Sequence, residues 1–266
     1  MTGVAEPVIL LRRRDYGDDD LITVFFSRNR GKLTAIAKSA KKSRKRFGGT
    51  LELFSLLSIV TAAGRGRGLP ILREASLQEA FAGIRADIVK TAYASYWVEL
   101  VDEWMEPGQA STELFDLLVY VLRSIDAGNV SSGFLSILFQ LRFMILAGFS
   151  PDLEGCSRCR LPLERFESQR SGFDLERGGL VCPNCGPGDA RGVTLSKGTL
   201  KELRWVARGD LEKAGRIRFS LRAVEEGLKL LEAFVPFHLG RELRSLKFLR
   251  QIRRPASPDD ERRPPA

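Results

Sequence analysis

The chain has 266 residues, of which 44% are hydrophobic, and a formal net charge of +9. This length is enough for two ordinary domains, and the apolar content excludes a wholly disordered protein. A pI near 9.6 favours a polyanionic partner: nucleic acid, an anionic membrane surface or an acidic protein tail.

The sequence contains no predicted membrane span or signal peptide. Its most apolar window, 134–149, is too short to cross a bilayer and contains Gln140 and Arg142. Charge is uneven, with net +7 in residues 1–80, −4 in 81–150 and +7 in 151–254. Because no amphipathic helix is predicted near the basic run around residue 41, nucleic acid is favoured over a membrane as the partner. We expect a cytoplasmic protein.

Residues 1–80 have the pattern of a small β-domain. Turn-like sequences separate five short apolar segments, which are 8–13, 21–27, 32–38, 51–62 and 69–80. Asn29-Arg30-Gly31 predicts a tight turn between the second and third segments. Five strands in this length predict a five-stranded OB-fold barrel, although an SH3-like barrel fits the strand count nearly as well.

A basic run connects the third and fourth predicted strands. Lys38 to Arg46 contains six cations and no acid. Such loops border the binding face of an OB barrel and contact phosphates, whereas the alternative is a solvated loop that aids solubility. Phe47 is the predicted base-stacking aromatic, since one of Phe25 and Phe26 should face the core. The predicted DNA contacts are Arg28, Arg30, Lys38, Lys41, Lys42, Arg44, Lys45, Arg46, Phe47, Arg65 and Arg67.

From residue 84 the hydrophobic period becomes helical. Helices are predicted over 84–105, 111–126, 131–147, 196–207 and 220–235. We expect Pro236 to end the fifth of these, and a last helix to follow over 238–252. Arg244 and Lys247 lie on a basic stripe of that helix, which is either a solvated face or a site for phosphates or an acidic tail.

All four cysteines lie in the interruption between the third and fourth of these helices. Cys156 and Cys159 form one C-x-x-C pair, and Cys182 and Cys185 form another after a spacer of 22 residues. Two such pairs predict a structural zinc site with four thiolates. Two disulfides or a redox pair are the alternatives; a cytoplasmic setting disfavours the first, and the lack of a βαβ unit disfavours the second.

The sequence offers no catalytic constellation. It lacks a phosphate-binding loop that opens a helix, and its one histidine, His238, makes a Ser–His or Cys–His nucleophile improbable. The acidic group at 18–20 is predicted to be a solvated turn. We therefore expect a non-enzyme of the α+β class, with an OB domain at 1–80, a helical domain at 81–254 interrupted by a zinc-ribbon-like insertion at 152–192, and a disordered tail at 255–266.

Several of these stretches resemble the RecO family of bacterial recombination mediators. They are "RRRDYGDDDLITVFF" and "SRNRGKLTAIAK" near the start, "LAGFSPDLEGCSRC" and "GGLVCPNC" around the cysteines, and "RELRSLKFLRQI" near the end. The resemblance covers nearly the whole chain except the tail. It implies an N-terminal OB domain, a helical domain and, in many members, a four-cysteine zinc element.

The resemblance also implies partners and a role in the RecF pathway of recombinational DNA repair. Members bind single- and double-stranded DNA, anneal complementary strands, and act with RecR to load RecA onto DNA coated with SSB, which implies a nucleoid-associated protein. They contact the acidic C-terminal tail of SSB through a pocket in the helical domain, for which Arg142, Arg244 and Lys247 are our candidates. Two alternatives remain: an RNA-binding OB protein of RNA processing or translation, and a zinc-ribbon adaptor for protein contacts.

Overall fold

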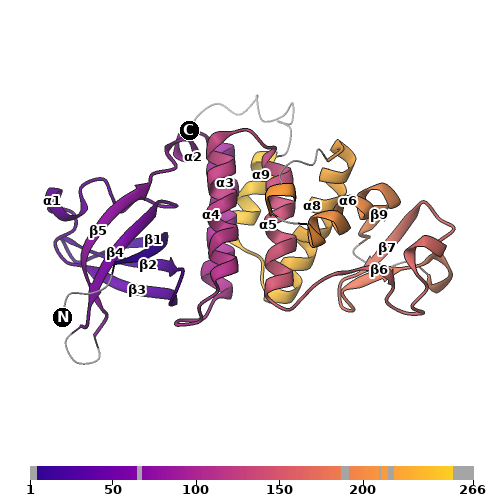
Figure 1. The fold of residues 1–266 in the computed structure, drawn as a ribbon, viewed down its shortest axis with the longest axis horizontal. Helices are drawn as coiled ribbons and strands as arrows, with labels where there is room; N and C mark the ends of the chain where they lie inside the picture. Colours follow the sequence, from indigo (N-terminus) through magenta and orange to yellow (C-terminus); the bar gives the residue numbers. More distant parts are fainter. Residues whose placement is uncertain (1–4, 65–67, 187–191, 210, 215–218, 254–266) are drawn as a thin grey trace, which may run out of the picture.

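The computed structural model describes residues 5–64, 68–186, 192–209, 211–214 and 219–253. Three parts follow one another along the longest axis of the molecule: a β-barrel, a group of helices and a small β-sheet (Figure 1). Among the described residues, no helix combines the length and apolar character that a bilayer crossing requires. The predicted tail at 255–266 lies outside the described residues.

The N-terminal part is a closed barrel with the strand order β1-β2-β3-β5-β4. Its strands are β1 (Glu6–Tyr16), β2 (Asp20–Ser27), β3 (Gly31–Ala37), β4 (Leu56–Ala62) and β5 (Ile71–Glu79). Neighbouring strands are antiparallel except β3 and β5, which close the barrel through a parallel pairing of Ile36 with Ile71. A short helix, α1 (Arg44–Phe47), lies in the β3–β4 connection. This architecture confirms the predicted OB fold and the α+β class.

The barrel is apolar on two sides. Side chains alternate along β1, so Val8 and Leu10 belong to the barrel interior whereas Ile9 and Leu11 join the core of the helices. On β2, Phe25 likewise points inward, and Phe26 points outward to pack 6.0 Å from the ring of Phe115. The barrel is therefore fixed to the helices by a buried apolar face.

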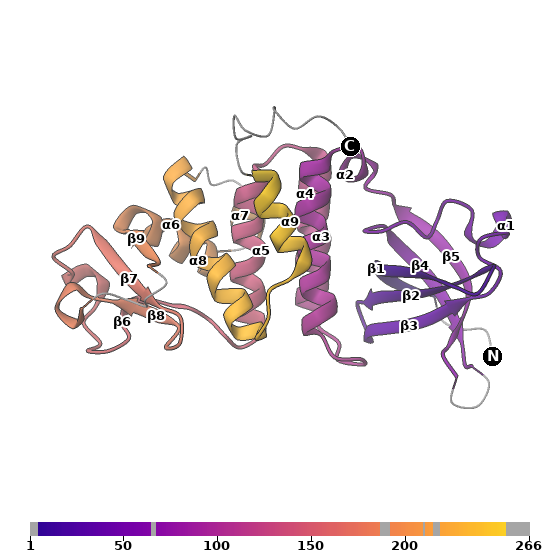
Figure 2. The ribbon, with the colours of Figure 1, turned by 180° about the vertical axis from the view of Figure 1, so that it is seen from behind.

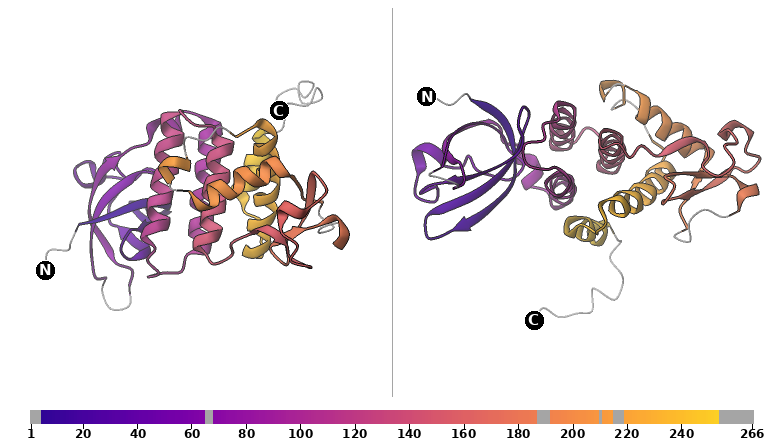
Figure 3. Two further views of the ribbon diagram at one scale, coloured as in Figure 1. Left: turned by 45° about the vertical axis from the view of Figure 1, so that its right-hand side comes forward. Right: turned by 90° about the horizontal axis from the view of Figure 1, so that it is seen from below.

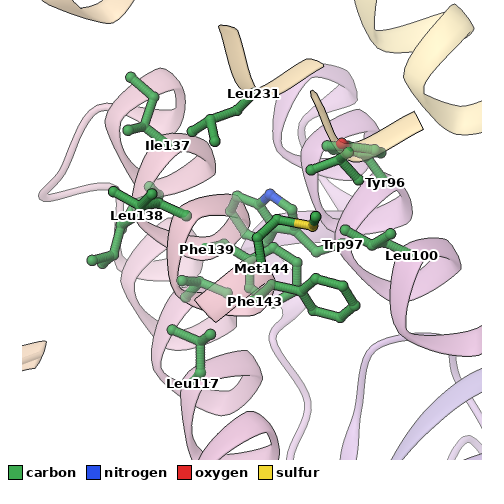
Figure 4. Close-up of a cluster of buried hydrophobic side chains, with 14 of the residues drawn as sticks. Tyr96, Trp97, Leu100, Leu117, Ile137, Leu138, Phe139, Phe143, Met144 and Leu231 are labelled. Carbon is green, nitrogen blue, oxygen red and sulfur yellow. The ribbon is translucent and has the colours of Figure 1, made fainter. Parts of the chain in front are cut away.

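The central part is helical. Its helices are α2 (Ala82–Arg85), α3 (Ile88–Trp104), α4 (Thr112–Ala127), α5 (Ser132–Leu146), α6 (Lys197–Arg208), α7 (Leu211–Ala214), α8 (Leu221–Leu239) and α9 (Arg244–Arg253). The first predicted helix is divided at Asp87, whose carboxylate caps α3 by accepting the N–H groups of Val89 and Lys90. Figure 4 shows a buried cluster of the core, in which the ring centroids of Trp97 and Phe139 lie 5.7 Å apart. Figure 2 shows α9 between α3 and α5.

The prediction that Pro236 ends its helix is wrong. Helix α8 continues to Leu239 and is capped by Gly240, so the last helix begins only at Arg244. Proline lacks the N–H that would bond to the carbonyl four residues earlier, here that of Glu232. Arg250 replaces it by donating to that carbonyl at 2.9 Å, so this acceptor keeps a partner.

The small sheet lies at the far end from the barrel (Figure 3). Its strands, in the order β6-β8-β7-β9, are β6 (Asp152–Cys156), β8 (Gly179–Val181), β7 (Arg170–Asp174) and β9 (Thr194–Ser196), and short 3-10 turns occur at Leu163–Arg165 (η1) and Pro183–Cys185 (η2). It extends past the predicted boundary at residue 192. Phe173 packs against Phe234 of α8 with ring centroids 5.7 Å apart, so this sheet shares its core with the helices.

Candidate nucleic-acid interface and metal centre

The basic run lies at one end of the barrel. Lys38 follows directly after β3, and Ala37 at the end of β3 pairs with Leu21 at the start of β2, so the run lies beside the β1–β2 turn. The exposed second half of β1 brings two further arginines to this place. We call this surface the basic end; its described cationic side chains are Arg13, Arg14, Lys38, Lys41, Lys42 and Arg46. Arg44 and Lys45 lie within α1, but their side chains are outside what the structure describes.

The structure does not bring Arg28 and Arg30 to the basic end. They lie in the β2–β3 turn, at the opposite end of both strands. Arg28 binds Asp116 of α4 through two hydrogen bonds of 3.1 and 2.9 Å, and Arg30 donates to Glu6 at 2.5 Å. Arg28 therefore joins the barrel to α4, whereas Arg30 links the β2–β3 turn to β1. Arg65 and Arg67 lie outside the described residues.

The prediction that Phe47 stacks on bases is wrong in this structure. Phe47 is the last residue of α1 and is only 4% exposed. Together with Leu51 it belongs to the core of the barrel. The guanidinium of Arg46 covers it at 5.0 Å from the ring centroid. The β3–β4 connection covers one end of the barrel. Phe47 is buried there because an apolar ring is more stable away from water.

An aromatic that sequence reasoning missed is Tyr16, the last residue of β1. Its side chain is 52% exposed, and the ammonium of Lys38 lies 6.0 Å from its ring centroid. Tyr16 was missed because it lies in an acidic turn sequence, Arg13 because it ends the predicted strand 8–13, and Arg14 because it lies between that strand and the turn. The available signal was the change within β1 from apolar to polar residues. A strand that extends past the edge of the core exposes both of its faces, so polar residues then follow one another.

A hollow of about 410 Å³ opens at the basic end. Arg13 and Lys41 are among its lining residues, and Phe47, Gly48 and Gly49 form part of its wall. The face of β2 that OB folds commonly offer to oligonucleotides is largely covered here, because Val24 and Phe26 are buried in the core shared with the helices. Within the described part of the barrel, the exposed cations around the hollow are a surface that an anion could reach.

Each C-x-x-C pair lies in a tight turn, which we call a knuckle, and the four cysteines lie together between the two knuckles. Their Sγ atoms all lie within 4.8 Å of one another, and those of Cys159 and Cys182 are 3.6 Å apart. A tetrahedral site with zinc–sulfur distances of about 2.3 Å places sulfurs roughly 3.8 Å apart, so this cluster fits a four-thiolate zinc ion. Four soft donors leave no open coordination position, which is typical of a structural site.

Backbone geometry shapes both knuckles. Gly155 precedes the first pair, and a Cβ there would lie 2.7 Å from the carbonyl oxygen of Leu161. Burial disfavours the charged form of Cys156, but N–H groups of the knuckles, those of Cys159 and Cys182 first, lower its pKa to about 6. A thiolate is the form that binds a metal ion, so the turn prepares this ligand.

The three candidates for an acidic tail do not form one site. Arg142 of α5 donates to the carbonyl of Gly209, just after α6, whereas Arg244 lines a separate cavity between α3 and the barrel. Gly209 also lines a cavity of about 360 Å³ on α6. The exposed indole of Trp205 forms its apolar wall, and its other lining residues are Lys201, Arg204 and Arg208. Lys247 is exposed on α9, as the basic stripe predicted.

Known proteins resemble this chain over nearly its whole length. The family model described as "Recombination protein O N terminal" matches residues 1–81, and "Recombination protein O C terminal" matches 85–247. A protein named "DNA repair protein RecO" from Desulfatibacillum aliphaticivorans is 47% identical, covering 96% of this chain and 99% of its own length. The proteins of that name from Desulfosudis oleivorans and Syntrophus aciditrophicus are 44% and 38% identical, over 95% and 92% of this chain.

Proposed function

This chain belongs to the RecO family, and on that premise we propose that it is a non-catalytic DNA-binding mediator of recombinational repair. In this proposal it anneals complementary strands and, with RecR, helps to load RecA onto single-stranded DNA coated with SSB. The observation that carries the proposal is the basic end, an exposed group of cations on an OB barrel.

The mechanism is electrostatic and needs no nucleotide hydrolysis. Two DNA strands repel each other through their phosphates, and a protein that neutralises both lowers this barrier to pairing. The basic end supplies such cations on a surface that is rigidly attached to the helices through Phe26 and Phe115. Tyr16 gives this surface an exposed ring on which a base can stack, a contact that tolerates any sequence.

Annealing of complementary strands coated with SSB, without ATP, tests the proposal. We expect rapid annealing that weakens between 50 and roughly 200 mM salt, because phosphate contacts release counterions. Binding to bare DNA without annealing through SSB would reduce the protein to a general single-strand binder. A clear preference for RNA over single-stranded DNA would support the RNA-processing alternative.

Charge reversal locates the activity. Lys41→Glu/Lys42→Glu should reduce annealing at least about tenfold, because it removes two phosphate contacts and adds repulsion. The matched control is Arg73→Glu/Lys213→Glu, which changes net charge equally at exposed residues of β5 and α7. Equal loss in both variants would indicate a general effect of net charge, and no loss in either would exclude the basic end as the DNA site.

For the SSB tail we propose the cavity beside Trp205. An acidic C-terminal peptide with apolar residues needs cations next to an apolar wall, which Lys201 and the indole provide. Trp205→Ala should abolish binding of a fluorescent SSB-tail peptide, while Lys247→Gln on α9 should leave it unchanged. The reverse result would transfer the tail site to the basic stripe of α9.

We also propose that the four cysteines hold one zinc ion. The ion would fix the two knuckles and thereby the β6–β8 pair, which joins directly to the first knuckle at Cys156. Its role in this proposal is structural, and DNA binds to the barrel. Metal analysis of the purified protein should give one zinc per chain, retained in the Lys41→Glu/Lys42→Glu variant.

A further inference from the structure

Three lysines of the basic end are already occupied by carboxylates of the chain itself. Lys38 binds Asp20 at 2.7 Å, Lys41 binds Asp15 at 2.9 Å, and Lys42 binds Asp19 at 2.7 Å. All three acids come from the β1–β2 turn and its flanking strand residues. We call this segment, Asp15–Asp20, the acidic turn.

The acidic turn is held against the lysines by backbone contacts. The carbonyl of Asp19 accepts the N–H of Lys41 at 3.0 Å, and the carboxylate of Asp20 accepts the N–H of Ser39 at 2.7 Å. The position of the carboxylates is therefore a property of the folded barrel.

The pairs are nevertheless open to exchange. The side chains of Lys42 and Asp15 are 74% and 75% exposed, so solvent reaches the pairs from at least one partner. Exposed ion pairs are weak and are screened by salt. A DNA strand with many linked phosphates can therefore displace the carboxylates, whereas the carboxylates return as soon as a phosphate leaves.

We propose that the acidic turn is a built-in competitor of DNA, which weakens the hold of the basic end so that strands can be released and exchanged during annealing. The inference rests on the proposed DNA site at the basic end. It gives a function to acids that the sequence presents only as a solvated turn. It also explains how a strongly basic run can persist at a protein surface without a permanent ligand.

The competitor changes the ion balance of binding. When a phosphate replaces a carboxylate, the freed carboxylate attracts a cation, which offsets the counterion that the phosphate released. Each lysine paired in this way contributes little to the salt dependence. Neutralising two of the acids should therefore steepen the log–log salt dependence of single-strand binding by about 1.4, since each phosphate contact contributes about 0.7.

The test compares two variants with equal charge change. Asp15→Asn/Asp19→Asn frees Lys41 and Lys42. The control is Glu74→Gln/Glu225→Gln, two exposed acids outside the acidic turn that make no ion pair within the described part of the chain. Asp20 is left intact because it also holds Ser39. We expect the first variant to bind a fluorescent oligonucleotide at least about threefold more tightly, with slower dissociation and the steeper salt dependence. The control should change affinity less than about twofold.

Equal affinities and salt slopes in the two variants would overturn the competitor. A third variant, Lys41→Gln/Lys42→Gln, separates this failure from failure of the DNA site. Weaker binding in that variant keeps the basic end as the DNA site whatever the acids do. If it binds DNA as the unmodified protein does, the proposed site itself is wrong. Thermal unfolding of all three variants checks that each barrel is folded.

Discussion

The basic end of the barrel and the four-cysteine cluster differ in how far their side chains are exposed and in what surrounds them. At the basic end the cations are exposed and are balanced by exchangeable carboxylates. In the sheet, Cys156 and Cys182 are buried, and Cys156 belongs to the same apolar core as the helices. Cys159 is exposed and Cys185 is partly buried, so the cluster reaches the surface on one side only. In terms of the two proposals, the basic end suits a ligand that exchanges, whereas the cysteine cluster suits an ion that stays bound as part of the fold.

The largest effect that this contrast predicts follows from removing two metal ligands. Cys156→Ser/Cys182→Ser should lose zinc and destabilise the sheet and α8 by more than about 4 kcal/mol, since loss of a structural metal is among the most damaging changes. Hydrogen exchange measured along the chain should show loss of protection in β6–β9. The barrel should keep its protection and its DNA affinity, and loss of both there would contradict the separation of the two regions.

Within the barrel, Phe47 tests whether the basic run depends on the core. Phe47→Ala should destabilise the barrel by about 3–5 kcal/mol, because it empties the space under α1. Urea unfolding measures this loss. Phe47→Leu keeps an apolar side chain there and should retain DNA binding. If Phe47→Leu lost base stacking while the barrel stayed folded, the original stacking prediction would be restored.

The sequence was sufficient for what depends on local pattern. Alternation and turn residues predicted the five strands, and the spacing of Cys156, Cys159, Cys182 and Cys185 predicted the cluster, because each knuckle is a local turn. The burial of Phe47 could not be read in the same way, since it depends on a loop closing over strands distant in sequence.

Pairings between distant residues explain the other differences. Helix α8 passes through Pro236 because Arg250 supplies a donor from another helix. Arg28 was predicted to contact DNA, but its side chain binds Asp116, which lies 88 positions later in the chain. Propensity and composition contain no information on such partners. A charge count can therefore suggest a polyanionic ligand, but it does not indicate which cations are paired within the chain.

Glu226 of α8 tests the contact that ties the cysteine sheet to the helices. It accepts the N–H of Ser196 at 2.7 Å and the hydroxyl of Thr199 at 2.6 Å. Burial alone would raise its pKa, but these hydrogen bonds and the one from Arg222 lower it from 4.5 to about 2. Its stabilising effect is therefore full above pH 4.5 and is lost as the pH falls toward 2.

Glu226→Gln should accordingly lower the free energy of unfolding by about 1–3 kcal/mol at pH 7, because the amide cannot satisfy all these donors. The difference from the unmodified protein should shrink as the pH falls from 4.5 to 2, provided that both proteins remain folded. Urea unfolding at several pH values measures it. A constant difference across this range would mean that the charge of Glu226 is not what stabilises the contact.

Tyr16 sharpens the account of the basic end itself. Tyr16→Ala should weaken single-strand binding by about 1–3 kcal/mol, the usual range for one stacked base, with little change in the salt dependence. Fluorescence anisotropy measures both. Tyr16→Phe keeps the ring and should bind as the unmodified protein does. Equal weakening in the two variants would assign the effect to the hydroxyl and not to stacking.

The smallest effect is expected for Arg28, at the other end of the same strands. Its side chain is occupied by Asp116, and both partners are nearly half exposed, so the pair contributes little to stability. Arg28→Gln should shift the thermal midpoint by no more than about 2 °C and leave DNA affinity unchanged, whereas Lys41→Gln, the same change at the basic end, should weaken binding. Equal weakening by both substitutions would mean that the DNA path runs the length of the barrel. An effect confined to Lys41 would instead mean that the two ends of the barrel have different roles. At one end a carboxylate, that of Asp116, links the barrel to the helices, and at the other end carboxylates exchange with phosphates.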